Sequence, residues 1–266
     1  KCITSSKMFS AMEITGVFTC WTMEANVNVD IPDYSRAYTM AHELSHLHGF
    51  MREDEANFIS LLAERTAAFD ENFGPDAKKI TACMGSGDYR TMWKDACEYL
   101  DLLNIMTYDC AGPWNNTTGH TSPISAPKND VAYLKRIGVD SHKINIGTPF
   151  YCYAWEVSAA NPDLTKLVGQ LGEADRPTGE SLSQKEFNEF KAQAIDFTVV
   201  TADGAKTKGI NGNTAGAAGW HLYYDAVAGA AYMYNNDSSS DYYKYFLTYE
   251  SEDSLHDKIE LIHEED

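Results

Sequence analysis

The chain has 266 residues, a formal net charge of −18 and an isoelectric point near 4.7. An acidic surface repels phosphate backbones, so nucleic acid is not an expected partner. No apolar run approaches the roughly 18 residues of a membrane-spanning helix, so no membrane span is expected. The first residues show no signal-peptide pattern. The expected location is nevertheless extracellular or in the cell envelope.

The first third of the chain begins with an extended segment and continues with two helices. Residues 13–31 are rich in β-branched and aromatic side chains and are predicted to be extended. Residues 38–48 and 54–70 are predicted helices, and Gly49 between them is typical of a helix end. The second helix opens on three acidic residues, Glu53, Asp54 and Glu55.

The first of these helices carries the run His42-Glu43-Leu44-Ser45-His46. On a helix, His42 and His46 lie on one face, where two imidazoles can hold Zn²⁺. The glutamate beside the first histidine can then act as general base for a metal-bound water. A zinc site needs a third protein ligand, for which Glu53 is the first candidate and Glu55 the second. The alternative is an amphipathic helix whose histidines pair with nearby carboxylates.

This region resembles a bacterial family of membrane-associated, zincin-like proteins of unknown function. The resemblance covers roughly residues 2–63 and rests on the stretches 14–18, 23–32 and 42–57. It implies a zinc-dependent, peptidase-like site at His42, Glu43, His46 and a following glutamate. The members of that family carry transmembrane helices before this region, whereas no such helix is expected in this chain.

Residues 64–153 alternate between predicted strands and helices. Strands are predicted at 79–84, 102–108 and 143–151, and helices at 91–99 and 130–137, with a loop over 111–127. The continuous apolar run at 102–108 is typical of a strand buried on both faces of a parallel sheet. The alternation itself is the pattern of βαβ units.

Residues 154–250 differ in composition, because they are rich in Gly, Tyr and Asp and contain only short strand-like pieces. We interpret them as an inserted α+β module, and residues 254–263 as a final helix. The predicted domains are therefore an N-terminal segment, 1–63, an α/β part, 64–153 with 251–266, and the insertion, 154–250.

A second group of polar and aromatic residues lies at predicted strand ends. Met106, Tyr108 and Asp109 end one strand, Trp114 lies on the loop that follows, and Tyr151 and Trp155 end the next strand. Catalytic and binding groups lie at such ends in (β/α)₈ barrels. Aromatic rings that stack on pyranoses, with a hydroxyl and a carboxyl beside them, indicate a sugar site. The alternative is a set of core aromatics and a helix-capping aspartate.

The C-terminal three quarters resemble the C-terminal half of family 18 glycoside hydrolases, the chitinase family. The resemblance covers roughly residues 55–266 and rests on the stretches 104–109, 112–115, 119–120, 143–147, 149–151, 224–225 and 248–249. It implies a barrel with an α+β insertion, N-acetylglucosamine polymers as ligands, and a substrate-assisted mechanism that requires no cofactor. It also implies that Tyr108 and Asp109 contact the acetamido group, that Met106 lines the site, and that Trp114 and Tyr151 hold sugars.

Three departures from the family pattern lower the expected activity. The Asp-x-x-Asp-x-Asp-x-Glu run that ends in the proton donor does not occur in this sequence, and Cys152-Tyr153 replaces the family's Gly-Arg. Only three barrel strands are visible, so the expected fold is α/β, a partial (β/α)₈ barrel with an α+β insertion, preceded by the helical segment of His42.

Three hypotheses follow for the function. The first is a chitinase-like glycan module that binds but does not hydrolyse efficiently. The second is a zinc metallopeptidase, and the third is a non-catalytic binding domain.

Overall fold

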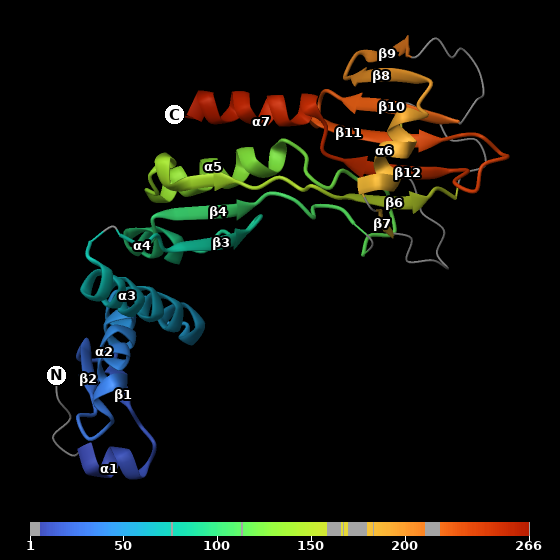
Figure 1. Cartoon of the computed structure of the whole chain (residues 1–266). Coiled ribbons are helices and arrows are strands. Elements are labelled where there is room, and N and C mark those ends of the chain that lie inside the picture. The colour runs from blue at the N-terminus through green and yellow to red at the C-terminus, as the bar shows by residue number, and fades with distance from the viewer. Residues whose placement is uncertain are drawn as a thin grey trace. The chain divides into compact units, whose positions relative to one another are not determined.

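The computed structural model describes residues 6–75, 77–112, 114–158, 166, 168–169, 180–182, 184–210 and 219–265 (Figure 1). The chain forms two compact units. Unit 1 comprises Lys1–Cys83, Tyr89–Asn104 and Leu134–Ile144, and unit 2 comprises Met84–Asp88, Ile105–Tyr133 and Asn145–Asp266. These units differ from the predicted domains, 1–63, 64–153 with 251–266, and 154–250. Those boundaries were drawn from sequence motifs and composition, and they stay a prediction.

Unit 1 begins with a helix, a hairpin and two longer helices: α1 (Ser6–Ala11), β1 (Gly16–Thr19), β2 (Glu24–Val27), α2 (Asp33–Leu47) and α3 (Glu53–Phe73). The hairpin is antiparallel and pairs Gly16 with Val27. Both predicted helices are present and longer than expected. Gly49 between them has φ 103°, a backbone conformation that glycine adopts without strain.

Helix α4 (Met92–Tyr99) completes the helical part of unit 1. Phe58 of α3 meets Trp93 of α4 edge to face, with ring centroids 5.7 Å apart. The C-terminal carbonyls of α4 are capped by Lys143, whose Nζ donates to the backbone oxygens of Cys97 at 2.6 Å and Leu100 at 2.9 Å. A cation at this end also complements the helix dipole.

Three strands form a small sheet in the order β3 (Thr81–Gly85), β4 (Leu102–Met106), β5 (Ile144–Ile146). Helix α4 joins the first two, and α5 (Ser125–Ile137) and a 3₁₀ turn (Ser141–Lys143) lie between the last two. The prediction of a single strand over 143–151 was wrong. Strand β5 ends at Ile146, and the chain is irregular through Pro149, whose missing N–H cannot continue a ladder.

Most of unit 2 is a seven-stranded sheet in the order β7-β6-β12-β11-β10-β8-β9. Of its pairs, β10 with β8 is parallel and the others are antiparallel. Helices α6 (Gln184–Ala192) and α7 (Glu252–Glu265) accompany it (Figure 1). The strands are β6 (Cys152–Glu156), β7 (Glu180–Leu182), β8 (Asp196–Thr201), β9 (Gly204–Gly209), β10 (Trp220–Asp225), β11 (Ala230–Asn235) and β12 (Tyr245–Tyr249).

Strand alternation divides the aromatic side chains of this sheet between two cores. One core contains Phe190 of α6 stacked on Trp220, with ring centroids 4.8 Å apart. The other contains Trp155, Tyr232 and Phe246, and Tyr223 stacks on Tyr232 at 4.7 Å. Aromatic rings bury large areas, so these two layers are expected to supply most of the stability of the sheet.

A buried polar network lies close to the end of β4. Lys258 of α7 is 2% exposed, pairs with Glu250 and donates to Ser122 Oγ at 2.8 Å. Ser122 in turn donates to the Thr107 carbonyl at 2.6 Å, and Thr107 Oγ1 donates to the Gly147 carbonyl at 2.8 Å. The network therefore fixes the backbone immediately before Tyr108 and Asp109.

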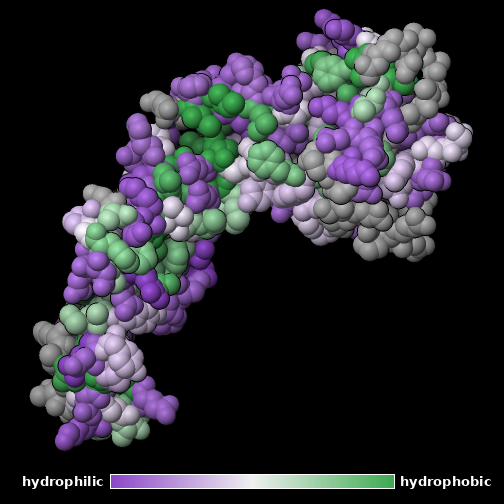
Figure 2. Space-filling view, in the orientation of Figure 1, coloured by the Kyte–Doolittle hydropathy of each residue, from purple (hydrophilic) through white to green (hydrophobic). Residues whose placement is uncertain are grey.

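The visible surface is mainly hydrophilic, as the charge of the chain predicts (Figure 2). No helix within the described ranges is long and apolar enough to cross a membrane.

Candidate functional site

Unit 1 brings together three residues that could ligate a metal: His42, His46 and Glu53. Helix α2 places the two histidines on one face, one turn apart, and Glu53 lies in the first turn of α3. The two Nε2 atoms are 3.1 Å apart. The Glu53 carboxylate lies 3.2 Å from Nε2 of His42 and 3.5 Å from Nε2 of His46.

These separations suit a tetrahedral zinc site. Zn–N bonds of about 2.0–2.1 Å at tetrahedral angles place two ligand atoms about 3.3 Å apart. His46 is oriented by its other ring nitrogen, Nδ1, which lies 2.6 Å from the Phe50 carbonyl. Such a contact fixes the tautomer that leaves Nε2 free for a metal. Nδ1 of His42 is buried and has no hydrogen-bond partner among the described residues.

Of the two predicted third ligands, the structure brings Glu53 to the histidines, while Glu55 is not in the cluster. The Glu53 side chain is 75% exposed, so solvent reaches the open side of the cluster. A cavity of about 550 Å³ lies there, lined by the cluster, Glu43, Met51 and residues 13–18. That volume is large enough for a peptide-sized group.

Glu43 is 5% exposed and borders the same cavity. Burial raises the pKa of its carboxyl, which His46 lowers and Glu53 raises further. Strand β1 passes so close to this carboxyl that a Cβ atom at Gly16 would overlap it. Sequence reasoning missed Gly16, although a glycine within a strand is a known sign of close backbone approach.

Unit 2 holds the second group of predicted site residues around Asp109. Two tyrosine hydroxyls donate to its Oδ1 atom, from Tyr151 at 2.5 Å and from Tyr153 at 3.0 Å. Asp109 has φ 60°, a left-handed conformation that aspartate tolerates better than most residues. Backbone conformations of this kind cluster at functional sites, where surrounding contacts hold them.

The aromatic residues around Asp109 form a connected surface. The Tyr108 and Tyr151 rings meet edge to face at 6.2 Å, and the Trp114 and Tyr153 rings do so at 5.5 Å. Trp114 is 59% exposed, so part of its ring is open to solvent. Burial and the hydrogen bond to Asp109 raise the pKa of Tyr151, so its hydroxyl stays protonated and donates.

Two further predicted members of this group are less exposed. Met106 is half-buried at the end of β4. Trp155 is 1% exposed, packs against Phe246 at 5.9 Å and donates from Nε1 to the Asn115 carbonyl. This burial contradicts the prediction that Trp155 faces a sugar, because its ring presents no open surface. Pro113, which precedes Trp114, lies outside the described residues.

Tyr153 is the residue of this surface that sequence reasoning did not select. It stands where the family pattern has an arginine, and it is two residues from Tyr151. Alternation along a strand places such residues on the same face, so the spacing could have indicated it. In the structure it supports both Asp109 and Trp114.

The comparisons with known proteins imply an α/β fold of the TIM-barrel class. A model of glycosyl hydrolases family 18 matches residues 21–266, and the chain belongs to this family. It is 30% identical over 139 residues to probable chitinase 2 of Drosophila melanogaster, covering 47% of this chain and 28% of that protein. It is 26% identical to chitinase A of Pseudoalteromonas piscicida over 242 residues, covering 76% of this chain and 27% of that protein.

Solved structures of the family have the same fold. A class V chitinase from Nicotiana tobaccum, a mutant in complex with NAG4, superposes with a TM-score of 0.58 at 18% identity. The match covers 79% of this chain and 56% of that one. A family 18 N-acetylglucosaminidase from Paenibacillus barengoltzii gives a TM-score of 0.58 at 24% identity, with coverages of 80% and 57%.

The chain thus spans just over a quarter of the two curated relatives and just over half of the two solved structures. These matches confirm the resemblance of residues 55–266 to the chitinase family. They give no support to the zincin-like resemblance of residues 2–63, and the family match itself begins at residue 21.

Proposed function

We propose that the chain binds N-acetylglucosamine-containing glycans at the surface formed by Asp109, Tyr108, Tyr151 and Trp114, and that it does not hydrolyse them efficiently. The observation that carries the proposal is the convergence of two tyrosine hydroxyls on Oδ1 of Asp109 beside an exposed tryptophan. We also propose that Met106, half-buried at the end of β4, lines this site. The chitinase complex with NAG4 supports the choice of ligand class.

The arrangement assigns a role to each group. The Asp109 carboxylate, held at Oδ1 by Tyr151 and Tyr153, keeps Oδ2 as the acceptor for an amide N–H. The open ring of Trp114 packs on the apolar face of a pyranose. Substrate-assisted hydrolysis needs a positioned proton donor besides this carboxylate. The Asp-x-x-Asp-x-Asp-x-Glu run that supplies the donor does not occur in this sequence.

The test is calorimetric titration of the full chain with N,N′,N″,N‴-tetraacetylchitotetraose. Trp114→Ala removes an exposed ring and is expected to weaken binding about tenfold or more, as for an aromatic anchor in a binding site. Val227→Ala is the matched control, because Val227 is also exposed in unit 2 and is remote in sequence from the site. Equal affinity in wild type and Trp114→Ala would refute the proposed surface.

A second function is proposed for unit 1 because of a separate observation, the His42, His46 and Glu53 cluster at the cavity. We propose that these residues bind Zn²⁺ and that Glu43 acts as general base in peptide hydrolysis. Three protein ligands with an open fourth position are the arrangement of catalytic rather than structural zinc sites. A bound ion would lower the pKa of its water and polarise a substrate carbonyl.

Zinc titration against a chromophoric chelator tests this second function. His42→Ala removes a ligand and is expected to weaken zinc binding by more than about 100-fold, beyond the effect of altering outer contacts. His48→Ala is the control, since His48 is exposed and outside the cluster. If saturating zinc leaves the wild-type protein metal-free, the cluster is only a set of paired side chains.

A further inference from the structure

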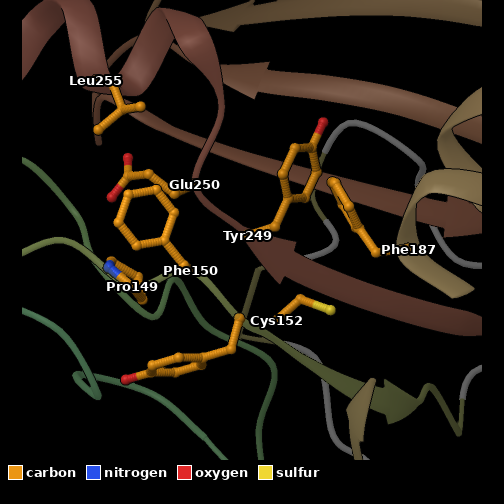
Figure 3. Close-up of a pocket in the computed structure, with 8 residues that line it drawn as sticks. Pro149, Phe150, Cys152, Phe187, Tyr249, Glu250 and Leu255 are labelled. Atoms are coloured by element: carbon orange, nitrogen blue, oxygen red, sulfur yellow. The ribbon is translucent and has the colours of Figure 1, made fainter. Parts of the chain in front are cut away.

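A pocket of about 150 Å³ lies beside Tyr151 in unit 2. Figure 3 shows its walls, where Phe187 and Tyr249 lie opposite Phe150 and Pro149. Walls of this kind accept many apolar groups alike, so they select no class of ligand. The contact between α2 and α3 in unit 1, beside the histidine cluster, has more specific partners.

Helices α2 and α3 are linked at two successive levels. At the first level, the Glu53 carboxylate approaches His42. At the second level, the Tyr38 hydroxyl donates to Oδ1 of Asn57 at 2.7 Å. Tyr38 precedes His42 by four residues on α2, so the two side chains share a helix face. Asn57 follows Glu53 by four residues on α3 in the same way. The hydrogen bond therefore joins the two helices one turn away from the potential metal ligands.

The rings of His42 and His46 are held in different ways. Nδ1 of His46 lies 2.6 Å from the Phe50 carbonyl, which fixes that ring. Nδ1 of His42 is buried and finds no hydrogen-bond partner within the ranges that the structure describes. The His42 ring stacks on that of Tyr38, with centroids 6.4 Å apart and 29° between the planes. Tyr38 is therefore a neighbour that can orient His42 where a hydrogen bond to Nδ1 is missing.

Tyr38 acts on the cluster from outside the cavity. It is half-buried, is not one of the three potential ligands and does not line the cavity of about 550 Å³. Its ring contacts one ligand, His42, and its hydroxyl is bonded to the helix that carries another, Glu53. It thus couples the orientation of the first ligand to the position of the second. Outer contacts of this kind change metal affinity about 10- to 100-fold.

We propose that Tyr38 is a positioning residue for the metal site, and that its bond to Asn57 sets the separation of His42 and Glu53 before an ion binds. Nε2 of His42 and the Glu53 carboxylate lie 3.2 Å apart, close to the ligand separation of a tetrahedral zinc site. Ligands that already stand at this separation lose less conformational freedom on binding. The inference rests on the proposed zinc binding, but it concerns residues that do not ligate the ion.

The experiment is a zinc titration of the full chain against a chromophoric chelator, together with the visible spectrum of the Co²⁺-loaded protein. Tyr38→Phe keeps the stacked ring and removes the hydroxyl, so zinc affinity should fall about two- to tenfold, as for one hydrogen bond. Tyr38→Ala also removes the ring and should weaken binding about 10- to 100-fold. Tyr34→Phe and Tyr34→Ala are the matched controls, because Tyr34 is 82% exposed one turn earlier on α2. Both should leave zinc affinity unchanged.

Asn57→Ala removes the same hydrogen bond from the other helix. Asn57 is exposed, so this replacement spares folding. If the bond acts as proposed, the effects of Tyr38→Phe and Asn57→Ala on zinc affinity are not additive, and the double variant binds about as well as the weaker single variant. Tyr38→Ala should also change the visible bands of Co²⁺, because they report coordination geometry. A merely structural role would lower the free energy of unfolding of the metal-free protein and leave that spectrum unchanged.

The outcomes separate this inference from the proposed zinc site. A loss of affinity that Tyr38→Phe and Asn57→Ala share, with an altered Co²⁺ spectrum in Tyr38→Ala, supports the positioning role. Wild-type affinity and spectrum in all three variants overturn it, while the zinc site stands. Losses that simply add in the double variant contradict the hydrogen bond as the link. If the wild-type protein binds neither ion, the zinc site itself fails and the positioning role fails with it.

Discussion

The two candidate sites differ in what surrounds their reactive groups. In unit 1 three ligand atoms converge, and a buried glutamate stands beside them at the edge of an open cavity. In unit 2 a carboxylate is held by two hydroxyls and bordered by aromatic rings. The first arrangement can activate water once an ion is bound, whereas the second can bind and orient a ligand. A chain can therefore belong to a hydrolase family and still carry the residues best suited to hydrolysis at another site.

The largest expected effect concerns the support of the unit 2 site. Lys258→Met leaves the Glu250 carboxylate buried without its partner, and such a change costs about 3–5 kcal/mol of the free energy of unfolding. Urea denaturation followed by tyrosine and tryptophan fluorescence measures it. Lys206→Met, at an exposed position of β9, is the control and should change stability by less than about 0.5 kcal/mol. Equal stability of the two variants would show that the ion pair does not support the scaffold.

The second prediction concerns acid stability of unit 2. The pKa of Asp225 is lowered by His120, whose Nε2 lies 3.2 Å away, and by the backbone N–H groups of Val227 and Ala228. A carboxyl with a lowered folded-state pKa stabilises the fold above its unfolded pKa of about 3.9, and this stability is lost as the pH falls through the folded value.

Asp225→Asn is accordingly expected to cost about 1.5–3 kcal/mol near neutral pH, the range for hydrogen bonds to charged groups. The difference from wild type should shrink as the pH falls below the unfolded pKa, and urea denaturation at a series of pH values measures it. Asp203→Asn, exposed between β8 and β9, is the control. A difference that grows in acid would contradict the sign of this effect.

A third prediction separates metal binding from chemistry in unit 1. Gly16→Ala introduces a Cβ that displaces the flexible Glu43 carboxyl and leaves the three ligands in place. Peptidase activity is expected to fall at least about tenfold, because positioned general bases contribute that much or more. Zinc affinity should stay within about threefold of wild type, since no ligand is altered. A parallel loss of both quantities would mean that the strand positions the ligands rather than the base.

The smallest effect is expected at Tyr153. Tyr153→Phe removes one of the two hydroxyls on Asp109 but keeps the ring that packs on Trp114. Chitotetraose affinity is expected to fall about two- to tenfold, as for one hydrogen bond. Tyr34→Phe, which alters an exposed hydroxyl in unit 1, should leave affinity unchanged. A larger loss than that of Trp114→Ala would reverse the assigned importance of the two residues.

Local patterns predicted the elements that carry both sites. The spacing of His42 and His46 placed them on one helix face, and the acidic first turn of the next helix supplied Glu53. The apolar run before Tyr108 and Asp109 is the strand β4. These features depend on residues that are close in sequence, where helix and strand periods determine which side chains share a face.

The features that depend on distant packing were not predictable. Trp155 shares the strand face of Tyr153, but it pairs with Phe246 of β12 and is buried, while the Tyr153 hydroxyl reaches Asp109. How deeply a strand residue is buried depends on the strands and helices beside it. The alternation of side chains along one strand does not reveal those neighbours. The close approach of Gly16 to Glu43 likewise joins two segments, and their spacing in the sequence does not predict that they meet.

The central claim is that the Asp109 surface binds its glycan without cleaving it. Incubation of chitotetraose with the full chain, followed over time by mass spectrometry under conditions in which titration shows the sugar to be bound, tests it most directly. The expected result is intact tetrasaccharide, with no more cleavage than in Asp109→Ala. Shorter oligosaccharides that accumulate with wild type and disappear with Asp109→Ala would contradict the claim and show that this chain has a proton donor.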